Sequence, residues 1–116
     1  MMRRNGRAGR KLGDAQLSAV AALFDVLSEP SRLRILHELH SGEASVGELV
    51  DRCEIKQANM SKQLGVLTSA GIIARRQDGN RAIYRIDMPL VLDLCSLVCH
   101  GLAEKVDQRA RALRSR

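Results

Sequence analysis

A run of hydrogen-bonding side chains with no acid lies in the middle of the chain, between Lys56 and Leu64. Amide side chains can bond to base edges in the major groove of DNA, whereas lysine and hydroxyl groups can reach the phosphates. The run therefore predicts a helix whose first turns enter the major groove. Its polar residues are Gln57, Asn59, Ser61, Lys62 and Gln63.

The cysteines are the other residues whose side chains could do chemistry. Cys95 and Cys99 are four apart on one face of a predicted helix, so a dimer joined along that helix would bring up to four thiols near one axis. Soft thiolates bind thiophilic metals or arsenite, and thiols can also be oxidised or persulfidated. In the alternative, both are small apolar side chains in a tight helix seam, the role expected of Cys53 in the core.

Other candidate sites are weaker. His100 and Glu104 could extend a site at Cys99, and His37 and His40 have a spacing compatible with a metal, but solvated histidines explain both pairs equally simply. The sequence contains no nucleophile beside a base and no phosphate-binding glycine loop, so we do not expect an enzyme.

Composition favours packed helices and a polyanionic partner. The 116 residues are enough for one domain, and 45% of them are hydrophobic but only 2% aromatic. Recognition of RNA by base stacking is therefore not expected. The net charge of +6 favours nucleic acid over a membrane, although solubilising charge alone would also explain it. With no apolar run long enough for a membrane span and no signal peptide, we expect a cytoplasmic protein.

Five helices and one hairpin are expected to position these residues. Asp14 is predicted to cap a first helix that runs to about Leu27. Ser28 is predicted to cap a second helix that begins near Pro30, and Ser45 is predicted to cap a third. The fourth helix starts near Lys56 or Gln57 and ends at a glycine, and two β-favouring runs then surround the turn at 78–80. The last helix runs from about 87–88 to 113, and its end, residues 105–116, forms a basic tail. Residues 1–13 are expected to be a flexible basic arm.

Two further patterns bear on partners. The last helix carries an apolar seam that is too long for one domain to bury, so it predicts a partner helix and a homodimer. That seam consists of Met88, Leu92, Cys95, Cys99, Leu102 and Val106. Arg75, Arg76 and Arg81 cluster near the hairpin tip, where they could hold a DNA backbone or could simply protect a solvated strand edge.

An ordered series of motifs resembles the ArsR/SmtB family of bacterial winged-helix repressors, from about Leu17 to Leu102. The series is SEPSRLRIL, SVGEL, QANMSKQLGVL, AGII and DGNRAIY. The resemblance implies a mostly α winged helix-turn-helix fold with about five helices and a two-stranded wing, covering residues 14–104. It also implies a homodimer through the first and last helices, whose fourth helix and wing bind an operator until an effector weakens the complex.

Carried over by position, the resemblance assigns two sets of DNA contacts. Gln57, Ala58, Asn59, Ser61, Lys62 and Gln63 face the groove, and Arg75, Arg76 and Arg81 hold the wing on the backbone. The chain departs from the family at Lys56, where a serine is usual, and at Gln63, where a histidine is frequent. The family's zinc or nickel ligand pattern in the last helix is not reproduced, because only His100 and Glu104 remain of it.

The residues together with the family resemblance predict a dimeric, sequence-specific repressor that binds an inverted-repeat operator as double-stranded DNA. The effector that releases it would be a thiophilic metal or metalloid such as arsenite, or a reactive sulfur species or oxidant, acting at Cys95 and Cys99. Two alternatives remain open at this point. One is a regulator that binds DNA constitutively, and the other is a winged-helix module that binds another protein.

Overall fold

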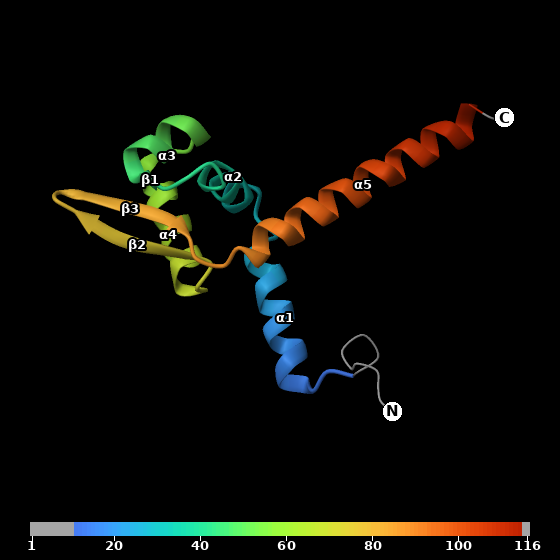
Figure 1. The fold of residues 1–116 in the computed structure, drawn as a ribbon, viewed down its shortest axis with the longest axis horizontal. Coiled ribbons are helices and arrows are strands. Elements are labelled where there is room, and N and C mark those ends of the chain that lie inside the picture. Colours follow the sequence, from blue (N-terminus) through green and yellow to red (C-terminus); the bar gives the residue numbers. More distant parts are fainter. Residues whose placement is uncertain (1–10, 115–116) are drawn as a thin grey trace.

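The computed structural model describes residues 11–114, and Figure 1 shows their arrangement. Within this range the chain forms five helices and three short strands. In chain order they are α1 (Asp14–Val26), α2 (Pro30–Leu39), β1 (Ala44–Ser45), α3 (Val46–Cys53), α4 (Gln57–Ser69), β2 (Ile73–Asp78), β3 (Arg81–Ile86) and α5 (Leu90–Arg114). Most of the predicted basic arm, residues 1–10, and the last two residues of the tail lie outside the described residues.

The caps of the first two helices differ from the prediction. Gly13, not Asp14, is the N-cap of α1, and its backbone N–H donates to Gln16 Oε1 at 2.8 Å. Glu29, not Ser28, caps α2 by accepting from the backbone N–H of Ser31 at 2.9 Å. The hydroxyl of Ser28 instead donates to the last turn of α1, at the carbonyl of Asp25. The helix begins directly at the proline, so the residue before it must serve as the cap.

The ends of α3 and α4 agree with the prediction. Ser45 and Glu48 form a reciprocal capping box, with Glu48 N to Ser45 Oγ at 3.2 Å and Ser45 N to Glu48 Oε1 at 2.8 Å. Gly71 ends α4 at φ 77°, and the N–H of Ile72 reaches back to the carbonyl of Leu67 at 3.1 Å. This is a Schellman ending, which needs a left-handed residue and so favours glycine.

The hairpin belongs to a slightly larger sheet than expected. β2 and β3 pair antiparallel with Asp78 opposite Arg81, which leaves a two-residue turn whose Gly79 has φ 62°. The two residues of β1 pair with the other edge of β3, at Tyr84 and Ile83, so the strand order is β1-β3-β2. This pairing fixes the entrance of α3 against the hairpin.

The core lies where α2, α3 and α4 meet one face of the sheet. Apolar residues from each of these elements, and Val91 from the start of α5, are almost completely buried. They include Ile35, Leu36, Leu49, Met60, Leu64, Leu67, Ile72, Ile73 and Val91. Burying a side chain of this size stabilises the fold by about 1.5–3 kcal/mol. These contacts hold α4 firmly, with one side against the core.

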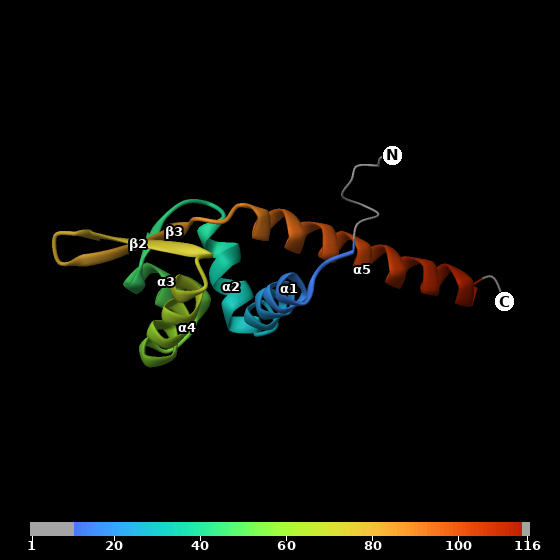
Figure 2. The same cartoon turned by 90° about the horizontal axis from the view of Figure 1, so that it is seen from below.

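Two helices extend away from this core. Figures 1 and 2 show α1 and α5 projecting from one end of the molecule, while α3, α4 and the hairpin occupy the other end. The Cα radius of gyration is 18.2 Å, whereas a compact chain of this length would have roughly 13 Å. No helix of residues 11–114 is long and apolar enough to cross a membrane.

Candidate DNA-binding surface

The first turns of α4 present a polar face to solvent. Gln57, Ala58, Asn59, Ser61 and Lys62 are all exposed, as the sequence predicts for a helix that enters a groove. The opposite side of the same helix is anchored, because Met60, Leu64 and Leu67 are at most 1% exposed. A helix held in this way presents its polar side chains on a rigid support.

Gln63 is an exception to the predicted groove-facing set. Its side chain is only 3% exposed, so it is not available for a direct contact with DNA. It accepts a hydrogen bond from Arg32 Nε at 2.7 Å and donates one from Nε2 to Asn59 Oδ1 at 3.0 Å. Helical spacing contained the signal for this burial, since positions 60, 63, 64 and 67 form one i, i+3, i+4, i+7 stripe.

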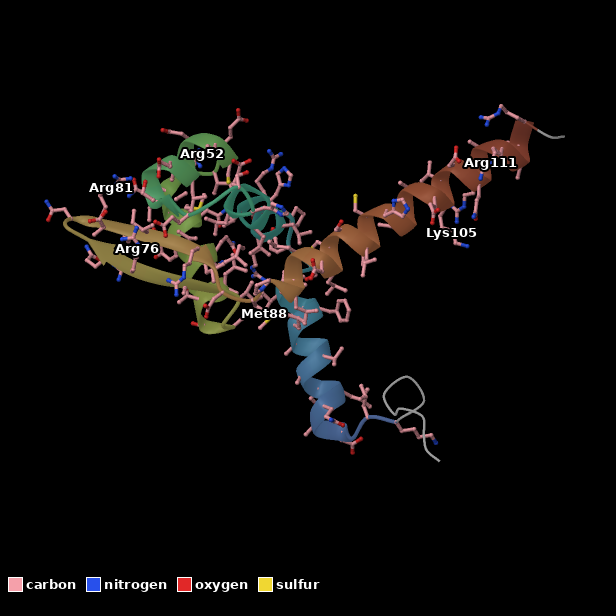
Figure 3. The ribbon with its side chains drawn as sticks, in the orientation of Figure 1. Arg52, Arg76, Arg81, Met88, Lys105 and Arg111 are labelled. Atoms are coloured by element: carbon pink, nitrogen blue, oxygen red, sulfur yellow. The ribbon has the colours of Figure 1, made fainter. Side chains whose placement is uncertain are left out.

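The three hairpin arginines are exposed but already have partners within the protein. Arg76 pairs with Glu43 through two hydrogen bonds, and Arg81 lies 3.4 Å from Glu48. Arg75 donates to Gln77 in the next-but-one position of β2. Figure 3 shows Arg76 and Arg81 along the hairpin, at the end of the molecule that also carries Arg52 of α3. The hairpin is thereby tied to the loop before β1 and to α3.

The acids of these pairs have perturbed titration. The hydrogen bond from Arg76 lowers the pKa of Glu43, and the same pair raises the pKa of Arg76. Hydrogen bonds from the backbone and hydroxyl of Ser45 lower the pKa of Glu48, with Arg52 and Arg81 adding to the effect. These shifts favour the charged forms of Glu43, Glu48 and Arg76. Because the pairs are open to solvent, they are weak and screened by salt, so a phosphate can replace the carboxylate.

Comparison with known proteins places this geometry in a family. A family model described as a helix-turn-helix domain matches residues 27–76. An HTH-type transcriptional regulator of Mycobacterium tuberculosis, Rv0081, is 39% identical over 94 residues, which cover 80% of this chain and 82% of the relative. Its crystal structure matches with a TM-score of 0.76 over 84% of this chain and 99% of that chain.

Two further relatives are also transcriptional regulators or DNA-binding domains. The first is a domain of Mb0332 from Mycobacterium bovis, described as a homodimeric winged helix-turn-helix DNA-binding domain of "a possible ArsR-family transcriptional regulator". It is 30% identical, with a TM-score of 0.74 over 90% of this chain and 95% of that chain. The biofilm growth-associated repressor of Agrobacterium fabrum is 40% identical over 73 residues, 63% of this chain and 62% of that protein. This chain belongs to the ArsR/SmtB family of winged helix-turn-helix transcriptional regulators.

Membership confirms the predicted fold class and assigns each element its place in the family's architecture. In this ArsR-family regulator, α3 and α4 are the helix-turn-helix pair, and β2 with β3 is the wing. The left-handed Glu54, at φ 56°, ends α3, and the short segment after it leads into α4. Lys56 is the N-cap of α4 and makes no side-chain capping hydrogen bond.

The cysteines of this ArsR-family chain lie in three different environments. Cys53 is buried in the core at the end of α3, and its pKa is raised by burial and then by Glu38. Cys95 is half-buried at the edge of the core, where burial raises its pKa, and Cys99 is exposed one turn further along α5. Within residues 11–114 of a single chain, no three ligand side chains come together as a metal site.

Both α1 and α5 expose large apolar side chains in a single chain of this family member. On α1, Leu17, Val20 and Phe24 are about half exposed, and several large apolar residues of α5 are 49–72% exposed. The latter are Leu90, Leu97, Val98, Leu102, Val106 and Leu113. So many exposed large apolar side chains on two helices indicate a surface that a partner covers.

Proposed function

We propose that this protein is a dimeric transcriptional repressor that binds an inverted-repeat operator through α4 and the wing. The observation that carries the proposal is the exposed polar face of α4, on a helix whose other side is fully buried. The exposed arginines of the wing lie at the same end of the molecule and supply positive charge for phosphates. Because its target is chromosomal DNA, the protein is proposed to act in the cytoplasm.

The proposed dimer joins two copies along α1 and α5. This pairing covers the exposed apolar residues on both helices and leaves α4 free at the far end of each copy. A twofold pair of recognition helices can enter successive major grooves about 34 Å apart, which demands an inverted repeat in the DNA. The homodimeric domain of the Mycobacterium bovis relative and the repressor role of the Agrobacterium relative support the proposal.

Selection of bound duplexes from a random library, followed by anisotropy at physiological salt, tests the proposal. We expect enrichment of an inverted repeat and an affinity that falls steeply with salt concentration. Gln57→Ala is expected to reduce discrimination between sequences by roughly tenfold, as loss of one base contact does, whereas Arg76→Ala weakens binding to all sequences alike. Absence of any enriched sequence would favour the protein-interaction module instead, and equal losses for both variants on specific and random DNA would contradict the assignment of α4.

We further propose that Cys95 and Cys99 make DNA binding responsive to a thiophilic metal or metalloid, or to oxidants and persulfides. Both are residues of α5: Cys99 is exposed on the side that the dimer would cover, and Cys95, one turn earlier, packs at the edge of the core. A modification at either thiol would change packing between α5 and its partner helix, and so change the spacing of the two recognition helices.

Titration of the DNA complex with arsenite, persulfide donors and peroxide tests this response. The wild-type complex is expected to dissociate with at least one of these agents, and a Cys95→Ser/Cys99→Ser double variant is expected to remain bound. Cys53→Ser is the matched control, because that thiol is buried and lies on α3, not on the proposed dimer helix. A double variant that responds like the wild type, or a wild type that responds to none of the agents, would indicate a constitutive regulator.

A further inference from the structure

Three side chains form a line of hydrogen bonds that begins beneath α4 and ends on its exposed face. Arg32 of α2 is held by a bond from its Nη1 to the carbonyl of Val26, at the end of α1, at 3.1 Å. Its Nε donates to Gln63 Oε1 at 2.7 Å, and Gln63 Nε2 donates to Asn59 Oδ1 at 3.0 Å. Gln63 is buried, whereas Asn59 is exposed among the residues proposed to contact bases.

The direction of every bond in this line follows from the chemistry of the first group. An arginine side chain has only donors, so the atom of Gln63 that faces Arg32 must be its carbonyl oxygen. The amide NH2 of Gln63 must then face Asn59, which has to offer its own oxygen in return. The N–H groups of Asn59 are therefore left to point away from the helix, toward solvent.

Reversal of the Asn59 amide is disfavoured by the burial of Gln63. If Asn59 turned its NH2 inward, two donors would face each other, and the buried NH2 of Gln63 would lose its acceptor. A buried donor without a partner is costly because it has lost its bonds to water as well. Gln63 in turn cannot reverse without placing its own NH2 against Arg32 Nε.

We propose that Arg32 and Gln63 are positioning residues that fix Asn59 as a hydrogen-bond donor, so that α4 selects a base edge that presents acceptors. In the major groove guanine presents two acceptors, N7 and O6, and thymine presents one, O4, whereas adenine combines its N7 acceptor with the N6 donor and cytosine presents only a donor. The pairing of an asparagine with adenine uses both the oxygen and the NH2 of the amide. Here the oxygen is turned toward Gln63, so the N6 donor of adenine would lack its acceptor. This inference rests on the proposed function and adds the base class that one residue of the site selects.

The test first locates the base that Asn59 contacts. Binding is measured to the selected operator and to its single-base variants, and the position at which Asn59→Ala abolishes discrimination defines the contacted base pair. At that position the wild type is expected to prefer guanine or thymine over cytosine by roughly tenfold. A preference for cytosine or adenine there, or the absence of any position that Asn59→Ala flattens, would overturn the inference.

Gln63→Glu is then expected to reverse the preference. A carboxylate has only acceptors, so it pairs with Arg32 and makes Asn59 turn its NH2 inward, which leaves the Asn59 oxygen facing the groove. The preferred base becomes adenine or cytosine, through N6 or N4 respectively. Gln108→Glu is the matched control, since it makes the same substitution at an exposed position of α5, outside the DNA-binding surface and the line of bonds, and should leave the preference at this position unchanged.

Thermal unfolding reveals whether Gln63→Glu folds. If it does not, two further measurements test whether Gln63 fixes the orientation of the Asn59 amide. Asn59→Asp alters an exposed residue, accepts from the same Gln63 NH2 and presents an oxygen to the groove, so it is expected to shift the preference in the same direction. In the free wild-type protein, the side-chain NH2 of Asn59 should exchange with solvent as an exposed group, while that of Gln63 is protected. Protection of Asn59 and exchange at Gln63 would overturn the inference.

The outcomes separate this inference from the proposed function. A wild-type protein that selects no sequence overturns both. A wild-type protein that selects an inverted repeat, while Gln63→Glu and Asn59→Asp keep its base preference, overturns the role of Arg32 and Gln63 alone.

Discussion

The two ends of this molecule differ in how their apolar helix faces are covered. At the end formed by α2, α3, α4 and the sheet, apolar stripes face one another and the core is complete within one chain. At the other end, α1 and α5 carry apolar stripes that face solvent, with Leu97 at 72% and Leu102 at 63% exposure. Helical apolar periodicity therefore predicts that a face is buried, but it does not distinguish burial within one chain from burial against a second copy.

The two ends are also connected. Arg32 bonds to the end of α1 through the carbonyl of Val26 and to α4 through Gln63. These two bonds join the end of α1 to the side chains of α4 through a single residue. We propose that the uncovered end, formed by α1 and α5, holds two copies together. The other end, formed by α2, α3, α4 and the sheet, contacts the operator.

The largest expected effect comes from charging the uncovered end. Leu102→Glu places a carboxylate in the proposed seam, and burying an unpaired charge there should convert the dimer to monomers. Because two linked half-sites bind much more tightly than one, operator affinity should fall by about 100-fold or more. Analytical ultracentrifugation and anisotropy measure the two effects.

The control for this change is Gln108→Glu, which adds the same charge to α5 at another exposed position. It should leave both the oligomeric state and the affinity close to those of the wild type. A dimeric Leu102→Glu variant would show that α5 does not form the seam.

A smaller effect tests whether the core of α2, α3, α4 and the sheet is formed within a single chain. In the monomeric Leu102→Glu background, Leu64→Ala is expected to lower the free energy of unfolding by about 2–5 kcal/mol, because it leaves a cavity at a residue that is 1% exposed. Leu97→Ala in the same background should change it by less than about 0.5 kcal/mol. Urea denaturation measures both, and equal losses would contradict the distinction between the two ends.

Releasing a wing arginine should have an effect of a few-fold. Glu43→Gln removes the carboxylate that competes with phosphate for Arg76, so DNA affinity is expected to rise by roughly two- to fivefold at low salt. The gain should shrink as salt increases, because the pair is exposed. Glu104→Gln on α5 makes the same charge change far from the wing and should have no such effect. Weaker binding by Glu43→Gln would instead mean that the pair is needed to hold the wing in place.

The smallest effect concerns the pH dependence of stability. The pKa of Glu48 is lowered in the folded protein by its bonds to Ser45, so this glutamate stabilises the fold above about pH 4.5, and the contribution is lost as pH falls through the lowered pKa. Glu48→Gln should therefore show a shallower decrease of Tm below pH 4.5 than the wild type. Parallel Tm profiles of the two proteins would show that the capping box contributes no pH dependence.

Local chemistry made much of the fold predictable. The capping box at Ser45, the glycine ending of α4 and the two-residue turn of the hairpin each depend on neighbours in the sequence, and each is present. The cap of α2 was not predicted correctly, because serine and glutamate stand side by side before the proline and either could serve. β1 is two residues long, which is too short to show alternation.

The candidate site was predictable only in outline. The exposed residues of α4 follow from the polar run, but the bond between Arg32 and Gln63 joins positions 31 residues apart and leaves no local signal. The pairing of Arg76 with Glu43 spans 33 residues and is hidden for the same reason. Such contacts depend on how α2, α3 and the wing pack together, which the spacing of residues within each element does not determine.

Hydroxyl-radical and methylation footprinting on the selected operator, combined with the stoichiometry of the complex, tests the central claim most directly. The account predicts two chains per duplex and two protected major-groove segments, one helical turn apart, with protection of the contacted base lost in Asn59→Ala. One chain per duplex with a single protected segment, or protection unchanged by Asn59→Ala, would contradict it.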